Sequence, residues 1–220
     1  MSQCVRIVAV SDLHGVLPEI PECDLLLIAG DIEPTSNHDV RFQAEWLDGP
    51  FRHWLAGTPA GQRIFIAGNH DLVFEQNPAL LPRDLPAVYL QDSGTEWRGL
   101  HIWGTPWQPW FFDWAFNLRE PDLVAKWDMI PAGTDILIVH GPPHRYGDAV
   151  PRKRGLDNTG SPSLLARIEQ IKPKLVVFGH IHEGRGQWQL GPTVLANVTI
   201  LDEKYQHVYP PWEYELAVDD

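Results

Sequence analysis

Five short stretches of this sequence combine histidine, aspartate or asparagine with glycine or serine, and each follows an apolar run. Their side chains offer carboxylate, imidazole and carboxamide groups but no thiolate, a set that suits divalent Mn, Fe, Zn, Ni or Co. Residues two apart in an extended chain point the same way, so Asp12 with His14, and His180 with His182, can each face one metal site. The five stretches are Ser11–Gly15 (SDLHG), Gly30–Asp31, Gly68–Asp71 (GNHD), His140–Pro143 (HGPP) and Gly179–Gly184 (GHIHEG).

Seven of these side chains are candidate ligands, which is too many for one ion. Two ions that share a bridging carboxylate account for them more naturally. A lone Asp-x-His or Gly-Asp pair is usually part of a turn, but all five stretches in this order favour a metal centre. The candidate ligands are Asp12, His14, Asp31, Asn69, His140, His180 and His182.

The apolar runs before these stretches predict strands buried on both faces, as in a parallel sheet covered by helices. Open α/β sheets bind ligands beyond the carboxyl ends of their strands, so the five stretches are expected at that end. The strands expected there are Val5–Val10, Leu25–Ala29, Arg63–Ala67, Asp135–Val139 and Lys174–Phe178. Further strands are expected at Ala87–Leu90 and Gly99–Trp103, and a hairpin joins Gln187–Leu190 to Thr193–Ala196.

Two helices are predicted, at Asp39–Leu55 and at Pro162–Ile171. The second has Ser161 as its N-cap and a proline at its first position. No repeat or linker divides the chain, so residues 1–220 are expected to form one α/β domain. The segment at Pro210–Pro211 is expected to be a docked tail.

Charge and hydropathy restrict the partners. With 17 basic and 29 acidic residues the net charge is −12, and such a surface repels phosphate backbones, so no stable nucleic-acid complex is expected. A phosphorylated small substrate stays compatible, because a metal ion can invert the local field. No window approaches 18 consecutive apolar residues, and the first residues lack the pattern of a secretory signal. The expected location is the cytoplasm, with no membrane partner.

The motif order D-x-H, GD, GNH[DE], H and GHxH resembles the calcineurin-like metallophosphoesterase superfamily, over Asp12 to at least His182. Three stretches are similar to its branch of MPPED-type phosphodiesterases: Gly104–Trp110 leading to Trp114–Asn117, then His140–Pro143, then Gly179–Gly184. The resemblance implies a four-layer α/β/β/α sandwich with two mixed β-sheets. It also implies a metal-dependent hydrolase of phosphoric esters.

The resemblance also implies a role for each motif residue. Asp31 would bridge two divalent ions, His70 would act as a general acid without binding them, and Asp71 would orient His70. A structural role for His70 is the alternative. The other ligands would divide into a first set, Asp12, His14 and His182, and a second set, Asn69, His140 and His180.

Two ions about 3.5–4 Å apart can clamp an in-line displacement at phosphorus and supply a bridging hydroxide at neutral pH. The expected activity is hydrolysis of small phosphodiesters, cyclic nucleotides included. Protein phosphatases of the superfamily carry arginine just after the GD and GNH motifs, whereas here Ile32–Pro34 and Leu72–Phe74 follow. Glu33 is expected to repel the second charge of a monoester, although Arg145 or Arg152 could reach the site from another loop.

Three alternatives stay open. A phosphomonoesterase, which includes a protein phosphatase, would use the same ions. A nuclease is disfavoured by the acidic charge, and a non-catalytic binding scaffold by the complete ligand set.

Six of the ten tryptophans lie between Trp97 and Trp127. The aromatic residues of segment 103–116 are predicted to form a wall that stacks a base or an aryl group, and the alternatives are packing on the core or an interface in a homo-oligomer. These residues are Trp103, Trp107, Trp110, Phe111, Phe112, Trp114 and Phe116. The basic run Arg152–Arg154, with His144 and Arg145, is either solvated or close to the phosphate entrance.

Overall fold

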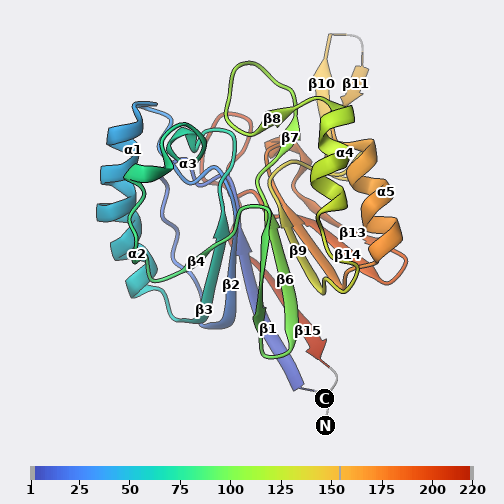
Figure 1. Ribbon diagram of the computed structural model, residues 1–220, viewed down its shortest axis with the longest axis horizontal. Helices are drawn as coiled ribbons and strands as arrows, with labels where there is room; N and C mark the ends of the chain where they lie inside the picture. Colours follow the sequence, from blue (N-terminus) through green and yellow to red (C-terminus); the bar gives the residue numbers. More distant parts are fainter. Residues whose placement is uncertain (1–2, 154, 219–220) are drawn as a thin grey trace.

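The computed structural model describes residues 3–153 and 155–218, and most of its strands form two mixed sheets that pack face to face (Figure 1). The first sheet has the order β15 (Trp212–Val218), β1 (Gln3–Val10), β2 (Cys23–Ala29), β3 (Ala60–Ile66) and β4 (Val88–Tyr89). The second has the order β13 (Gly186–Leu190), β14 (Thr193–Asn197), β12 (Leu175–Phe178), β9 (Ile136–Val139), β6 (Leu100–Thr105) and β5 (Ser93–Trp97).

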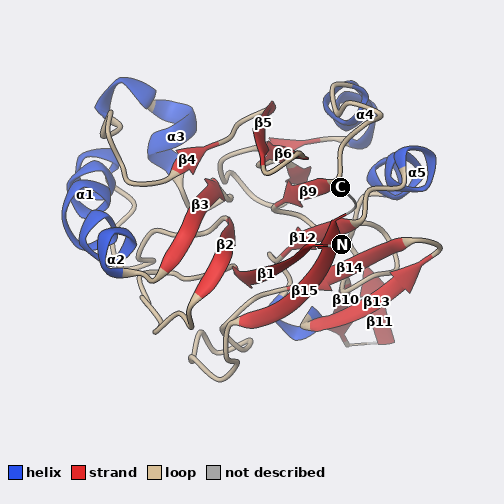
Figure 2. Cartoon of the chain, turned by 90° about the horizontal axis from the view of Figure 1, so that it is seen from below, coloured by secondary structure: helices blue, strands red, loops and turns tan. Residues whose placement is uncertain are grey.

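Helices cover the outer face of each sheet (Figure 2). The first sheet is covered by α1 (Val40–Trp46), α2 (Arg52–Gly57) and α3 (Leu72–Gln76), and the second by α4 (Glu120–Asp128) and α5 (Pro162–Ile171). Successive strand residues point to opposite faces, so Val5, Ile7 and Ala9 pack between the sheets while Val8 and Val10 pack under the helices. The predicted α/β/β/α sandwich with two mixed β-sheets is therefore confirmed.

Most of the predicted elements are present. The five strands before the motifs all form, and the hairpin pairs Leu190 with Thr193. Ser161 caps α5 by accepting a hydrogen bond from the amide of Leu164 at 3.1 Å. The helix predicted at Asp39–Leu55 is interrupted by a π-helical turn, Leu47–Phe51, which contains Pro50. Proline lacks the amide proton that an α-helix needs, and the wider turn carries the chain past it.

The docked tail predicted at Pro210–Pro211 is wrong, because the chain continues there into β15. This strand runs antiparallel to β1, with Tyr214 opposite Ile7. Its alternating apolar and acidic residues fit an edge strand with one face on the core. The strand β5 and the helices α3 and α4 were not predicted either, and nor were two 3-10 turns, Pro78–Leu80 and His182–Gly184. Two short strand pairs are also new: β7 (Gln108–Pro109) with β8 (Asn117–Leu118), and β10 (Ala149–Arg152) with β11 (Gly155–Asn158).

The carboxyl ends of the motif-bearing strands meet at one end of the sandwich, at the top in Figure 1. Strands β1, β2 and β3 run parallel to one another, and β9 runs parallel to β12. Backbone hydrogen bonds join the loops that follow: the Asp12 amide donates to the Gly30 carbonyl, and the Gly179 amide to the His140 carbonyl, both at 3.0 Å. Among the described residues, no helix has the length and apolar character needed to cross a bilayer.

Candidate metal centre

The backbone is strained at the ligand loops. Four of the seven candidate ligands have positive φ: Asp12 (55°), His14 (43°), Asp31 (52°) and His180 (68°). Such angles are uncommon outside glycine and cost about 1–3 kcal/mol each, so they persist only where the surrounding structure fixes them. This backbone strain lowers the stability of the fold, and it directs the four side chains toward one point.

The first ligand set lies together. Single ligand atoms of Asp12, His14 and His182 all lie within 4.8 Å of one another. The Nδ1 of His182 donates to the Asp202 carbonyl at 2.9 Å, which leaves its Nε2 facing Asp12 Oδ1 at 3.5 Å. Both carboxylate oxygens of Asp12 accept from the amide of His180, at 2.9 and 3.1 Å, so this loop contact orients the carboxylate.

The second set converges in the same way. The Nδ1 of His140 donates to the Ala29 carbonyl at 2.9 Å, because a carbonyl can only accept. Its Nε2 then lies 2.9 Å from Asn69 Oδ1, which is also 2.8 Å from His180 Nδ1. Each of these contacts is a hydrogen bond when the ring nitrogen carries a proton, and a cation bound among the three atoms would take the place of those protons.

Asp31 lies between the two sets. Its Oδ2 is 3.6 Å from His14 Nε2 and 3.5 Å from His140 Nε2, while its Oδ1 accepts from the His70 amide at 2.8 Å. One carboxylate oxygen therefore reaches a ligand of each set, which is the placement that a bridging carboxylate requires.

The buried groups fit two divalent ions. Both ring nitrogens of His14 are buried and have no hydrogen-bond partner among the described residues. An unpaired buried polar group is costly, and a bound ion would satisfy one of these nitrogens. Burial lowers the pKa of His14 to about 4 and that of His180 to about 3, so both rings are neutral, as metal ligands must be. The carboxylates of Asp31 and Asp12 outweigh burial at His140 and His182 and raise the pKa of each ring to about 9, so a bound ion would have to displace a proton from these two.

The expected contact between Asp71 and His70 is wrong. The carboxylate of Asp71 instead accepts three backbone hydrogen bonds, from Gly68 at 2.7 Å and from Ile32 and Glu33 at 2.9 Å each. It therefore clamps the loop after β2 to the loop after β3. No described residue hydrogen-bonds the Nδ1 of His70.

His70 is held by packing and by its backbone. Its ring lies 4.2 Å from the ring of Trp114, centroid to centroid, and 4.8 Å from that of His14. Gln43, a buried polar residue on α1, donates to the His70 carbonyl at 2.8 Å and accepts from the Val73 amide at 2.9 Å. The sequence analysis missed Gln43, because a polar residue on a helix gives no sign of being buried.

The family model for calcineurin-like phosphoesterases matches residues 5–184. The chain belongs to this family. It is 39% identical over 240 residues to metallophosphoesterase domain-containing protein 1 of Homo sapiens, an alignment that covers 96% of this chain and 71% of that protein. The solved phosphopantetheinyl hydrolase from Mycobacterium tuberculosis is 15% identical, with a TM-score of 0.61 and coverage of 96% of this chain and 95% of that one, which is a likeness of fold alone.

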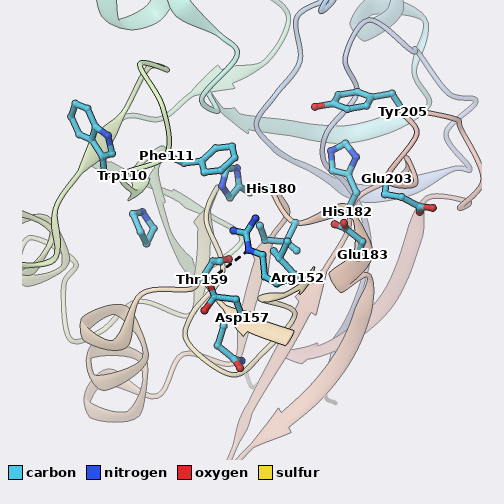
Figure 3. A pocket seen from close by; sticks show the side chains of 14 residues that line it. Trp110, Phe111, Arg152, Asp157, Thr159, His180, His182, Glu183, Glu203 and Tyr205 are labelled. Atoms are coloured by element: carbon cyan, nitrogen blue, oxygen red, sulfur yellow. Dashed lines mark ion pairs between the residues drawn. The ribbon is translucent and has the colours of Figure 1, made fainter. Parts of the chain in front are cut away.

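A cavity of about 520 Å³ opens beside the candidate metal ligands, and His180 and His182 form part of its wall (Figure 3). Trp110 and Phe111 lie on one side of the cavity and Tyr205 on the other. The cavity therefore joins the metal centre to an aromatic surface large enough for a small organic ester.

The aromatic segment 103–116 divides between this cavity and the core. Only Trp110 and Phe111 line the cavity, while Trp114 contacts His70. Trp107 is held inside by a hydrogen bond from its Nε1 to Asp92. Of the remaining members, Phe116 lies in the core, Trp103 packs against it, and Phe112 is 69% exposed. The predicted aromatic wall is therefore wrong for most of the segment.

The two charge expectations also need revision. Glu33 is fully buried, and burial with the nearby Asp71 raises its pKa to about 10, so it is neutral and repels nothing. Arg152 lines the cavity, so its loop does bring an arginine toward the ligands, whereas the exposed Arg145 is not among the described lining residues. Arg154 lies outside the described residues.

Tyr205 was not predicted from the sequence to lie near the metal centre. Its ring lies 4.9 Å from that of His14 and 5.0 Å from that of His182, centroid to centroid. No motif marks it, and only the path of the chain after β14 brings it over the first ligand set.

Proposed function

We propose that this phosphoesterase is a binuclear-metal phosphodiesterase that hydrolyses small phosphodiesters, with cyclic nucleotides among the candidate substrates. The observation that carries the proposal is the position of Asp31, whose Oδ2 lies within 3.6 Å of a ligand nitrogen in each set. The donor set suits two ions of Mn, Fe, Zn, Ni or Co. Bound there, such ions supply Lewis-acid stabilisation of the phosphoryl group and activation of water at neutral pH.

His70 is the chain's own candidate for proton transfer. It lies against His14 outside the two ligand sets named above, although one ligand atom each of His70, His14 and Asp31 lie within 4.8 Å of one another. The Nδ1 of His70 has no partner among the described residues. Burial lowers the pKa of His70, so the ring gives up a proton readily once it carries one. Such a donor can protonate the leaving alkoxide, a step that a nitrophenolate leaving group needs far less.

The preference for diesters follows from the positive charge available. The loops after Asp31 and Asp71 provide no arginine, and Leu72, Val73 and Phe74 are buried. Enzymes that bind a phosphate dianion usually add an arginine fork. A diester carries one charge, which the two ions can neutralise alone.

A phosphomonoesterase is the second candidate, and Arg152 is the observation that favours it. This arginine lines the cavity but pairs with Asp157 at 3.8 Å and has 52% of its side chain exposed. If it binds a dianion instead, Arg152→Gln will lower turnover of a monoester and spare a diester.

The decisive experiment compares two substrates after metal is restored. We expect kcat/KM for bis(4-nitrophenyl) phosphate to exceed that for 4-nitrophenyl phosphate by at least about tenfold. Elemental analysis on the same sample should find two ions per chain. A clear preference for the monoester, lost in Arg152→Gln, would establish the second candidate instead. The cytoplasmic location and the homo-oligomer stay predictions from the sequence.

A further inference from the structure

Tyr205 is fixed in place by a turn that also orients a metal ligand. The Asp202 carboxylate accepts from the amides of Lys204 and Gln206, both at 2.9 Å. The Asp202 carbonyl accepts from the Tyr205 amide and from His182 Nδ1, again at 2.9 Å each. One carbonyl oxygen therefore sets the position of Tyr205 relative to the first ligand set.

The backbone conformation of Tyr205 is strained, and about half of the residue is exposed. Its φ is +60°, which is strained for a bulky residue, and its side chain stays exposed, at 49% for the whole residue. No described residue hydrogen-bonds its hydroxyl. A strained, half-exposed aromatic ring that faces a cavity is a candidate contact for a ligand.

Phe111 occupies the corresponding place beside the second ligand set. Its ring lies 6.4 Å from that of His180, edge to face, and it is 46% exposed beside Trp110. Asn117 fixes this loop by donating to the Phe111 carbonyl at 3.0 Å. Figure 3 shows Phe111 beside His180 and Tyr205 beside His182, on opposite sides of the cavity.

The charges in the cavity limit what can lie on these rings. Arg152 pairs with Asp157, while Glu183 and Glu203 also line the cavity and form no ion pair with a described residue. Away from the candidate metal ligands, the excess charge of the described lining residues is therefore negative. Like charges brought together are strongly unfavourable, so an ester group with its own carboxylate or phosphate is disfavoured.

We propose that the preferred substrate is an acyclic phosphodiester with two uncharged, flat or apolar ester groups, one lying on Phe111 and Trp110 and the other on Tyr205. The proposal rests on the proposed function, since both groups must flank a phosphate held at the metal centre. A cyclic nucleotide has both ester oxygens on one ribose and a single base to place, so it would leave one aromatic subsite empty.

The test uses two substrates with the same leaving group, bis(4-nitrophenyl) phosphate and methyl 4-nitrophenyl phosphate. Phe111→Ala and Tyr205→Ala each remove one subsite. The variant at the subsite of the leaving group should lower kcat/KM about tenfold for both substrates, and the other variant should do so for the diaryl substrate alone. Tyr205→Phe keeps the ring and should retain the wild-type ratio of the two substrates.

Matched comparison variants exist on the same two segments. Phe112 is next to Phe111 and Val208 is close to Tyr205, both are exposed, and neither is among the described residues that line the cavity. Val208→Ala should behave like the wild type. Phe112→Ala removes a ring that packs on Phe111 at 4.5 Å between centroids, so it should have the same selectivity as Phe111→Ala with a smaller effect. All variants should keep their metal content and thermal midpoint, which separates loss of a subsite from loss of the fold.

A third substrate, carboxymethyl 4-nitrophenyl phosphate, tests the charge requirement. It should react at least about tenfold more slowly than the methyl ester, and equal rates would overturn that requirement. The two-subsite proposal is overturned if both variants reduce both substrates equally, if both spare the methyl ester, or if neither has an effect. A wild-type enzyme that prefers monoesters would instead refute the proposed function, so the two failures are distinguishable.

Discussion

The indole ring of Trp114 lies 4.2 Å from the imidazole ring of His70, centroid to centroid, at an interplanar angle of 38°. This contact, and not a carboxylate, positions the candidate proton donor, because the Asp71 carboxylate accepts hydrogen bonds from three backbone amides. No described residue hydrogen-bonds the buried Nδ1 of His70, so packing and not a fixed acceptor sets the direction of the ring.

His70→Ala should lower kcat/KM most for the substrates that have the poorest leaving groups. General acid catalysis contributes about 10²–10⁴-fold, so alkyl esters should lose that much in kcat/KM while nitrophenyl esters lose little. Metal content should stay at the wild-type value, because Asp31 and three other candidate ligands serve each ion; a loss of metal would instead make His70 a ligand, since it groups with His14 and Asp31 within 4.8 Å. Equal losses on alkyl and nitrophenyl esters would assign His70 a structural or binding role.

Trp114→Ala should also lower kcat/KM more for alkyl esters than for nitrophenyl esters, but by a smaller factor than His70→Ala. Without the indole, the His70 ring can leave its position, and we expect a loss of about tenfold on alkyl esters and little change on nitrophenyl esters. Trp114→Phe retains a ring against His70 and should recover most of the activity. A loss that is independent of the leaving group, or that Phe does not rescue, would show that Trp114 only packs the loop.

Asp31→Ala should abolish binding of both ions and nearly all turnover, since its Oδ2 faces a ligand of each set. Asp31→Asn is the matched variant, because asparagine tolerates the positive φ of 52° at this position and keeps the side-chain shape. It should fold normally and still bind metal weakly. Elemental analysis after chelation and refilling decides: near wild-type activity in Asp31→Ala would end the two-ion account.

The sequence was sufficient to predict that the candidate ligands lie together, but not to predict the residues that support them. The candidate ligands directly follow strand ends, and strand ends at one edge of a sheet must meet, so Asp12 and His180 could be expected near one another although 168 residues separate them. Asp71 could not be placed in this way. It follows His70 in the chain, yet its side chain turns toward the amides of another loop, and adjacency in sequence does not fix direction in a turn.

Burial and loop path explain the other differences. Glu33 follows a motif and is expected at a surface, but the clamp from Asp71 turns it inward, where burial changes its charge. Tyr205 lies 23 positions after His182 with no motif of its own. Its role depends on a turn that only the finished second sheet positions, so no local pattern could reveal it.

The last prediction separates backbone strain from damage to the metal centre. Gly30 has a φ of +91°, and a Cβ at this position would lie 2.7 Å from the Ala67 carbonyl oxygen and from His140 Nδ1. Gly99 has a similar φ of +75°, but a Cβ there meets no described atom within 4 Å. Both Gly30→Ala and Gly99→Ala should lose about 1–2 kcal/mol of unfolding free energy from the left-handed backbone.

Only Gly30→Ala should also displace His140 and break its hydrogen bond to the Ala29 carbonyl, which fixes the ring for the second ion. An ion that binds the folded chain raises its thermal midpoint, and tighter binding gives a larger increase. Added manganese should therefore raise the midpoint of the wild type and of Gly99→Ala equally, and that of Gly30→Ala much less. If manganese protects all three proteins to the same extent, His140 is not held at the metal centre by the packing around Gly30.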